Sequence, residues 1–147
     1  MLPTRLSNTQ ESSLAMQPLT IFESNQRYLI NDLVVRLRTG ANCSCEQESM
    51  LIGFIRNTED LSSLWLAVCG LHLVHKPHRH AEVIFDACCR LRTSSSEFLR
   101  LAAYRWLSRL HTLDLRYEIV AQKLLKAALK QEAAVLQKHL KTLLRAS

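Results

Sequence analysis

The chain holds very few residues that form tight turns, and this limits its fold more than any other feature. Only 3 glycines and 3 prolines occur among its 147 residues. A β-sandwich or β-barrel of this length needs many turns of the kind that use Gly, Pro and Asn. The good helix formers Leu, Ala, Arg, Lys, Gln and Glu are abundant instead, and apolar residues make up 48% of the chain. The sequence therefore predicts an all-α fold with a substantial core.

Cysteine usage and the apolar pattern indicate the cellular setting. The five cysteines, an odd number in spacings that suit disulfides poorly, are Cys43, Cys45, Cys69, Cys88 and Cys89. The first twenty residues contain no continuous apolar stretch of an export signal. No apolar run approaches the roughly 20 residues that span a bilayer. We therefore expect a cytoplasmic protein with free thiols and no membrane span.

Apolar periodicity divides the chain into a leader and one helical domain. Residues 1–22 are expected to form a flexible leader, and residues 23–147 a single domain. Seven helical segments are expected, over residues 24–38, 44–56, 61–75, 78–92, 97–111, 114–130 and 132–144. The expected start and stop signals are Ser24, a capping box of Ser44 with Gln47, Asp60, Ser95 or Ser96, and Gly40. The connecting loops are short, which favours antiparallel neighbours.

Large and small residues recur in the spacing of a tetratricopeptide repeat. In that repeat, small residues let two helices cross closely and large residues fill the space beside them. The first match comprises Trp65, Val68, Cys69, His72, Ala81, Phe85 and Cys88. The second match comprises Tyr104, Leu107, Ser108, His111, Val120, Leu124 and Ala127, in which Val120 is larger than the pattern asks. With a third, more degenerate pair over residues 25–56, this predicts antiparallel helix pairs in a tetratricopeptide-like right-handed array. A generic helical bundle is the alternative.

Five stretches of the sequence, taken in order, resemble a known family. They are residues 33–40, residues 47–52, the helix pair from Trp65 to Cys88, residues 98–106 and the closing basic helix. Together they are similar to the small tetratricopeptide chaperones of type III secretion needle subunits, over roughly residues 28–144. The resemblance implies a cytoplasmic chaperone that works with a second small helical co-chaperone. It would bind the amphipathic helix of a self-assembling needle subunit and prevent premature polymerisation.

A partner helix would lie in a groove lined by the first helix of each repeat, with apolar anchors along one face. The groove residues expected from the repeat are Ser63, Leu66, Gly70, Leu73 and Val74 in the first pair and Ala102, Arg105, Arg109, Thr112 and Leu113 in the second. The leucines and Val74 would form the desolvated centre of this partner-binding site, and Arg105 and Arg109 would pair with acidic residues at its edge. The alternative is that these leucines belong to the ordinary core.

Metal binding and catalysis were weighed against the same residues. His72, His75, His78 and His80 with Cys43, Cys45, Cys88 and Cys89 could supply zinc ligands, but their spacings match no standard zinc signature. No thiol is marked as an activated nucleophile, and no phosphate-binding glycine loop or paired carboxylates occur. We therefore expect no enzyme activity, no metal and no cofactor.

The net charge of +6 leaves a second function open. Basic residues line the C-terminal helices, namely Lys123, Lys126, Lys130, Lys138, Lys141 and Arg145. A small helical DNA-binding transcription regulator would use them on phosphates. No aromatic stacking platform accompanies them, so a solvated helix face is favoured and nucleic acid is not expected as a partner. A structural subunit that self-assembles through its apolar surface is the remaining alternative.

Overall fold

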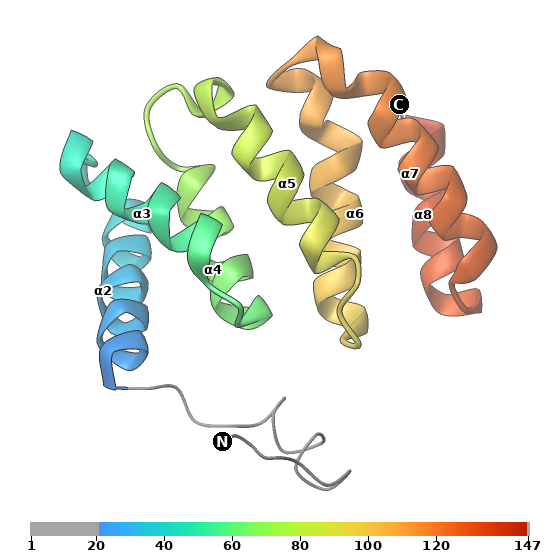
Figure 1. Cartoon of the computed structure of the whole chain (residues 1–147). Coiled ribbons are helices and arrows are strands. Elements are labelled where there is room, and N and C mark those ends of the chain that lie inside the picture. The colour runs from blue at the N-terminus through green and yellow to red at the C-terminus, as the bar shows by residue number, and fades with distance from the viewer. Residues whose placement is uncertain (1–20, 147) are drawn as a thin grey trace, which may run out of the picture.

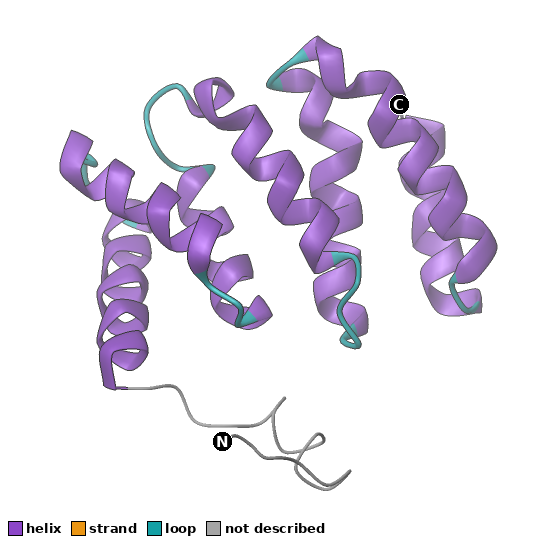
Figure 2. Cartoon of the chain, in the orientation of Figure 1, coloured by secondary structure: helices purple, strands orange, loops and turns teal. Residues whose placement is uncertain are grey.

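The computed structural model describes residues 21–146, and within that range the chain forms helices and turns without a strand (Figure 2). The α-helices are α2 (Ile21–Arg38), α3 (Cys45–Asn57), α4 (Leu61–Leu71), α5 (Ala81–Leu91), α6 (Glu97–Arg109), α7 (Glu118–Gln131) and α8 (Ala134–Ala146). Three short 3-10 helices join them: η1 (Pro77–His80), η2 (Leu110–Thr112) and η3 (Leu115–Tyr117). The predicted all-α fold is confirmed for the described residues.

The helices stack in two layers (Figure 1). Helices α2, α4, α6 and α8 form one layer, and α3, α5 and α7 form the other. Each helix contacts the next one along the chain, and helices two apart also meet, as α2 meets α4, α4 meets α6 and α6 meets α8. Apolar side chains between the layers form one continuous core from Ile30 in α2 to Leu140 in α8.

Polar residues set the helix starts as the sequence indicated. Ser44 and Gln47 form a reciprocal capping box at the start of α3, the Asp60 carboxylate accepts the Ser63 N–H at α4, and the Ser96 hydroxyl accepts the Leu99 N–H at α6. Each bond satisfies an N–H that the first helical turn leaves without a partner. Gly40 follows α2 with a φ of 94°, a conformation that glycine adopts without a steric penalty. These four predictions are confirmed.

The predicted start of the first helix is wrong. Ser24 lies inside α2, which already includes Ile21 and Phe22. The predicted leader therefore extends too far by at least these two residues, and its remaining residues, 1–20, lie outside the described part of the chain.

Several helices are shorter than predicted because their ends make other hydrogen bonds. The segment expected over residues 61–75 ends at Leu71, and the His72 ring then donates from Nδ1 to the Val68 carbonyl. Lys76 takes a left-handed φ of 55° and Pro77 opens a 3-10 turn, so α5 begins only at Ala81. Glu132 takes an extended conformation between α7 and α8, which makes the last helix separate from α7.

The positions expected to pack closely are buried in the first helix pair, whereas in the second pair the buried positions are displaced by one residue. Val68, Ala81 and Cys88 are fully buried where α4 meets α5. In α7, however, Val120 and Ala127 are exposed, and the buried residues are Ala121, Leu125 and Ala128. The predicted packing of Val120 and Ala127 is wrong because the two 3-10 turns between α6 and α7 hold one more residue than the pattern assumed.

Gly70 sits where α4 lies closest to α2. A Cβ at this position would lie 2.8 Å from Val34 Cγ2 and 3.5 Å from Leu51 Cδ2. Val34 is buried and its branched side chain is stiff, so it has no free space to move into. Gly53, in the middle of α3, is the opposite case, since a Cβ there would meet no atom within 4 Å.

We expect substitutions at these two glycines to change stability in opposite directions. Gly70→Leu adds bulk to a filled crossing and should lower the free energy of unfolding by about 1–3 kcal/mol. Gly53→Ala should raise it by about 0.5–1 kcal/mol, because alanine loses less backbone entropy in a helix. Urea titration followed by circular dichroism measures both. A Gly70→Leu variant as stable as the natural chain would contradict the close contact between α2 and α4.

Candidate functional site

The structure separates the predicted groove residues into a buried set and an accessible set. Ser63 is 2% exposed and donates its hydroxyl hydrogen to Asp60. Gly70 faces Val34 of α2, and Val74 is buried in the core. Other parts of the chain cover these three positions, with Val34 of α2 and Leu51 of α3 lying over Gly70. Any contact with a partner therefore falls to the accessible set.

The accessible set lies on α4, on α6 and in the turn after α6. On α4, the predicted Leu66 is half-buried and the predicted Leu73, just beyond the helix, is 45% exposed. Cys69, which was not predicted for the groove, is half-buried between them at a spacing of i, i+3 and i+7. On α6 the predicted residues are Ala102, Arg105 and Arg109, of which the two arginines are exposed, and the exposed Phe98, which was not predicted, lies on the same helix. We call these seven residues the α4–α6 surface.

Two aromatic contacts hold α4 beside α6. Trp65 meets Phe98 edge to face, with ring centroids 5.2 Å apart. His72 stacks on Trp106 at 5.3 Å with an angle of 29° between the rings. The first contact joins the middle of α4 to the start of α6, and the second joins the residue after α4 to the last turn of α6, so the two helices are held together at two points.

Sequence reasoning did not identify Phe98 and Trp106 as part of the site. A signal was available, because Trp65 and Phe98 are 33 residues apart and His72 and Trp106 are 34 apart. These separations are close to the length of one tetratricopeptide repeat. The exposed Tyr28 and Val35, seven residues apart on α2, were also missed.

A hollow of about 340 Å³ opens at the C-terminal ends of α4 and α6. It is lined by His72, Trp106, Arg109, Leu110, Thr112 and Leu113. Three of these residues, Arg109, Thr112 and Leu113, were predicted from the repeat. The hollow combines apolar and aromatic walls with one guanidinium. It has the chemistry to take a large apolar side chain beside a carboxylate.

His72 is the histidine among the residues that line this hollow. Burial lowers its pKa, and the positive charge of Arg109 lowers the pKa further, although the hydrogen bond to Val68 acts in the other direction. The ring is therefore neutral at pH 7. Because the Val68 carbonyl accepts from Nδ1 at 2.9 Å, Nε2 is left as the acceptor nitrogen of the neutral ring.

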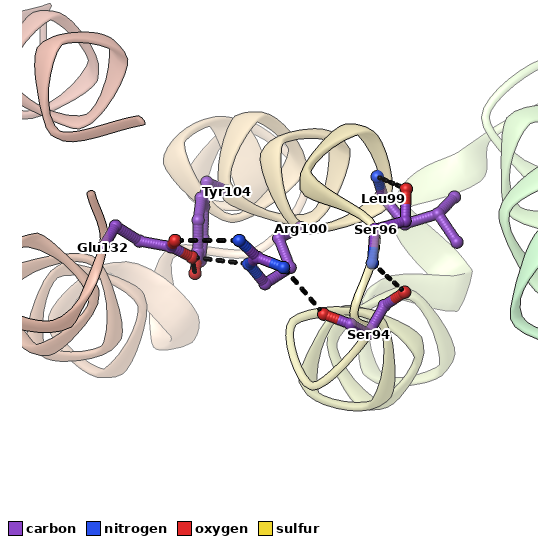
Figure 3. A network of polar contacts seen from close by, with 6 residues as sticks. All are labelled: Ser94, Ser96, Leu99, Arg100, Tyr104 and Glu132. Carbon is purple, nitrogen blue, oxygen red and sulfur yellow. Dashed lines mark hydrogen bonds and ion pairs between the residues drawn. The ribbon is translucent and has the colours of Figure 1, made fainter. Parts of the chain in front are cut away.

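A polar network fixes α6 against the last two helices (Figure 3). The Arg100 guanidinium binds both carboxylate oxygens of Glu132, with Nε 2.7 Å from Oε2 and Nη2 3.0 Å from Oε1. Tyr104 donates its hydroxyl hydrogen to the same carboxylate. Arg100 also donates to the Ser94 carbonyl at 3.0 Å. One arginine thus joins the turn before α6 to the turn before α8.

This network shifts the pKa values of its members in opposite directions. The hydrogen bond from Arg100 lowers the pKa of Glu132, with a smaller contribution from Tyr104. Burial raises the pKa of Tyr104 to about 12, and its hydrogen bond to Glu132 adds to the rise. Both shifts favour an ionised carboxylate and a neutral phenol, which is the state that the hydrogen bonds require.

Of the cysteines and histidines considered as metal ligands, Cys43, Cys45 and His75 line one hollow beside Glu48, whereas His72 lines the hollow at Trp106 and Cys88 lies in the core. All five cysteines are free. Cys88 is fully buried, and burial raises its pKa. His80 pairs with Glu48 at 2.9 Å. Among the described residues, no three His, Cys, Asp or Glu side chains come together in a way that could hold a metal ion.

Two further observations concern membrane-spanning helices and similarity to known proteins. Among residues 21–146, the helices all fall short of the length and apolarity that crossing a lipid bilayer requires. No family model, curated protein or solved structure matched the chain when it was compared with them.

We expect Glu132→Gln to lower the free energy of unfolding by about 2 kcal/mol at pH 7, because it removes a charged acceptor from a nearly buried network. The pKa of Glu132 is lower in the folded chain than its ordinary value of 4.5. The carboxylate therefore makes its full contribution to the free energy of unfolding above about pH 4.5. It is lost as the pH falls through the folded pKa. The difference between the two proteins should therefore shrink in acid.

Urea titrations between pH 7 and pH 3 measure this difference. Glu59→Gln, at an exposed position outside the helices, is the matched control and should change stability by less than about 0.5 kcal/mol at every pH. A difference between Glu132→Gln and the natural chain that is independent of pH would contradict the assignment.

We expect Arg109→Gln to raise the pKa of His72, because it removes the positive charge at the hollow. The pKa should stay below the ordinary value of 6.5, since burial is the larger cause of the shift. Titration of the ring-proton resonances by nuclear magnetic resonance, assigned with His72→Gln, measures the change. Arg105→Gln removes an equal charge from the same helix and should leave this pKa nearly unchanged. Equal shifts in both variants would place Arg109 away from His72.

Proposed function

We propose that the chain is a binding module that holds an amphipathic helix of a self-assembling partner protein and catalyses no reaction. The partner that fits best is a needle-type subunit of a type III secretion system, kept from premature polymerisation in the cytoplasm. A second small helical protein would act as co-chaperone. This proposal combines the sequence resemblance with the chemistry of the α4–α6 surface.

The two-layer stack supports a tetratricopeptide-like architecture. In such arrays, antiparallel helix pairs stack with a right-handed twist and their first helices line the inner face. Helices α2, α4 and α6 would be those first helices, and α3, α5 and α7 their partners. Contacts between helices two apart in the chain are what this arrangement requires, and α8 would cover the last pair.

One observation carries the proposed function: apolar side chains remain accessible on the α4–α6 surface although buried positions lie on either side. Leu73 is 45% exposed and Phe98 is 61% exposed, and they lie toward opposite ends of this surface; other large hydrophobic residues are exposed elsewhere in the described chain. Exposed apolar side chains along adjacent helices are typical of an interaction site. Arg105 and Arg109 lie beside them and would pair with acidic residues of the bound helix.

The partner would be bound by burial of apolar anchors at the centre of the surface. A helix presents anchors at i, i+3, i+4 and i+7, and Leu66, Cys69 and Leu73 offer apolar contacts at a similar spacing. The hollow at Trp106 and Leu113 would take one large anchor. Binding of this kind concentrates its free energy in a few apolar residues.

We expect Leu73→Asp to weaken partner binding by about tenfold or more while leaving the helical circular dichroism spectrum unchanged, because a carboxylate would be desolvated inside the bound surface. Val120→Asp is the matched control. Val120 is 36% exposed but belongs to α7 in the other layer, so this variant should bind normally.

The experiment isolates the helical protein that co-purifies with the chain at high salt and follows polymerisation of that purified protein by light scattering. We expect an equimolar amount of the natural chain or of Val120→Asp to prevent polymerisation, whereas Leu73→Asp fails to do so. If the natural chain leaves polymerisation unaffected, the chaperone function is wrong. If Leu73→Asp still prevents polymerisation, the α4–α6 surface is not the site.

A further inference from the structure

The last two helices carry positive charges that have no partner within the described part of the chain. Six cations, all exposed, lie on α7 and α8: Lys123, Lys126, Lys130, Lys138, Lys141 and Arg145. None of them forms an ion pair with another described residue. The acidic residues of residues 118–146 are Glu118 and Glu132, and Glu132 is already bound by Arg100.

Elsewhere in the structure, cations are more often neutralised. Arg27, Arg36, Arg79, Arg100 and Arg116 each lie within 4 Å of a carboxylate. Five of the six ion pairs of the described residues thus involve arginines from α2 to η3, and the sixth joins His80 to Glu48. Other described cations also lack a carboxylate partner, among them Arg56 and Lys76, but α7 and α8, at the C-terminal edge of the stack (Figure 1), carry six cations of which none is paired.

The charges on α7 form one row that continues into exposed aliphatic side chains. Lys123, Lys126 and Lys130 follow each other at spacings of three and four residues, which places them on one helix face. One turn before Lys123 on that face lies Ile119, which is 69% exposed, and Leu115, which is 75% exposed, opens the 3-10 turn η3 directly before α7. We call these five residues the α7 strip.

We propose that the α7 strip docks on a membrane surface that contains anionic lipids. Lys123, Lys126 and Lys130 would pair with lipid headgroups, and Leu115 and Ile119 would insert shallowly into the interface. A basic row joined to exposed aliphatic side chains is the pattern of segments that lie on a membrane, and each lysine near an anionic leaflet adds to the attraction. On α8, the row of Lys138, Lys141 and Arg145 would add to the electrostatic attraction toward anionic lipids.

The aliphatic residues favour lipid over nucleic acid. Phosphate contacts on DNA or RNA require cations but gain nothing from exposed Leu115 and Ile119. Binding of single strands uses aromatic side chains as stacking platforms, and residues 118–146 contain no Phe, Tyr or Trp. Exposing two large aliphatic side chains to water is unfavourable for the isolated chain, and membrane insertion would remove them from water.

Co-sedimentation of the full chain with lipid vesicles at about 0.15 M salt tests this proposal. One set of vesicles contains phosphatidylcholine alone, and the other contains phosphatidylcholine with phosphatidylserine. We expect binding to the anionic vesicles only. Lys123→Glu with Lys126→Glu should weaken that binding by at least about 25-fold, because each lysine near an anionic surface accounts for about fivefold. Leu115→Ser with Ile119→Ser should weaken it by about tenfold.

The matched control is Arg56→Glu with Lys76→Glu. It reverses two exposed cations outside α7 and α8 and changes the net charge of the chain by the same amount. This variant should retain most of the vesicle binding, and thermal unfolding confirms that each variant is folded.

Three results would overturn the proposal. Equal loss of binding in the control pair would mean that net charge alone attracts the chain to the vesicles. Equal binding to neutral and anionic vesicles would remove the role of the lysines. Tight binding to duplex DNA that depends on Lys123 and Lys126, without binding to anionic vesicles, would make nucleic acid the ligand of the α7 strip.

Discussion

The close approach of α2 to α4 at Gly70 is the constraint on which the arrangement of the stack depends. The missing side chain of Gly70 lets Val34 of α2 approach the backbone of α4, since a Cβ there would lie 2.8 Å from Val34 Cγ2. With α2 seated there, one side of α4 is covered and its next free face turns toward α6. The α4–α6 surface therefore owes its position to a contact in which none of its own residues takes part.

Aromatic contacts then decide how much of that face stays accessible. Trp65 and His72 lean toward α6 and meet Phe98 and Trp106, so the large rings lie between the helices. Leucine and arginine side chains are left on the outside. Burial keeps His72 neutral beside Arg109, and the guanidinium therefore remains the only positive group among the residues that line the hollow. A bound carboxylate would meet a single cation there.

Sequence reasoning succeeded where a local rule decides the outcome and failed where distant contacts decide it. The caps at Ser44, Asp60 and Ser96 follow from hydrogen bonds within one helical turn, and all three are present. Burial of Ser63 and Gly70 depends instead on α2, a helix some thirty residues earlier in the chain. No local sequence pattern predicts how that helix packs. The shift in α7 arose in 3-10 turns, whose residue count a helical period does not fix. The shared helix face of Ala102, Arg105 and Arg109 was predictable because such positions follow helical spacing alone, but their role in partner binding stays a prediction.

The two proposed surfaces differ in the interaction that would drive binding, and this difference separates their roles physically. Apolar burial would drive binding at the α4–α6 surface and would persist at high salt. Charge would drive binding at the α7 strip, where salt screens it beyond about 8 Å at physiological ionic strength. The network of Arg100, Tyr104 and Glu132 couples α6, which carries half of the first surface, to the turn between α7 and α8. If the chain docks on a membrane through the α7 strip, the bidentate contact of Arg100 with Glu132 ties α6 to the turn that follows α7.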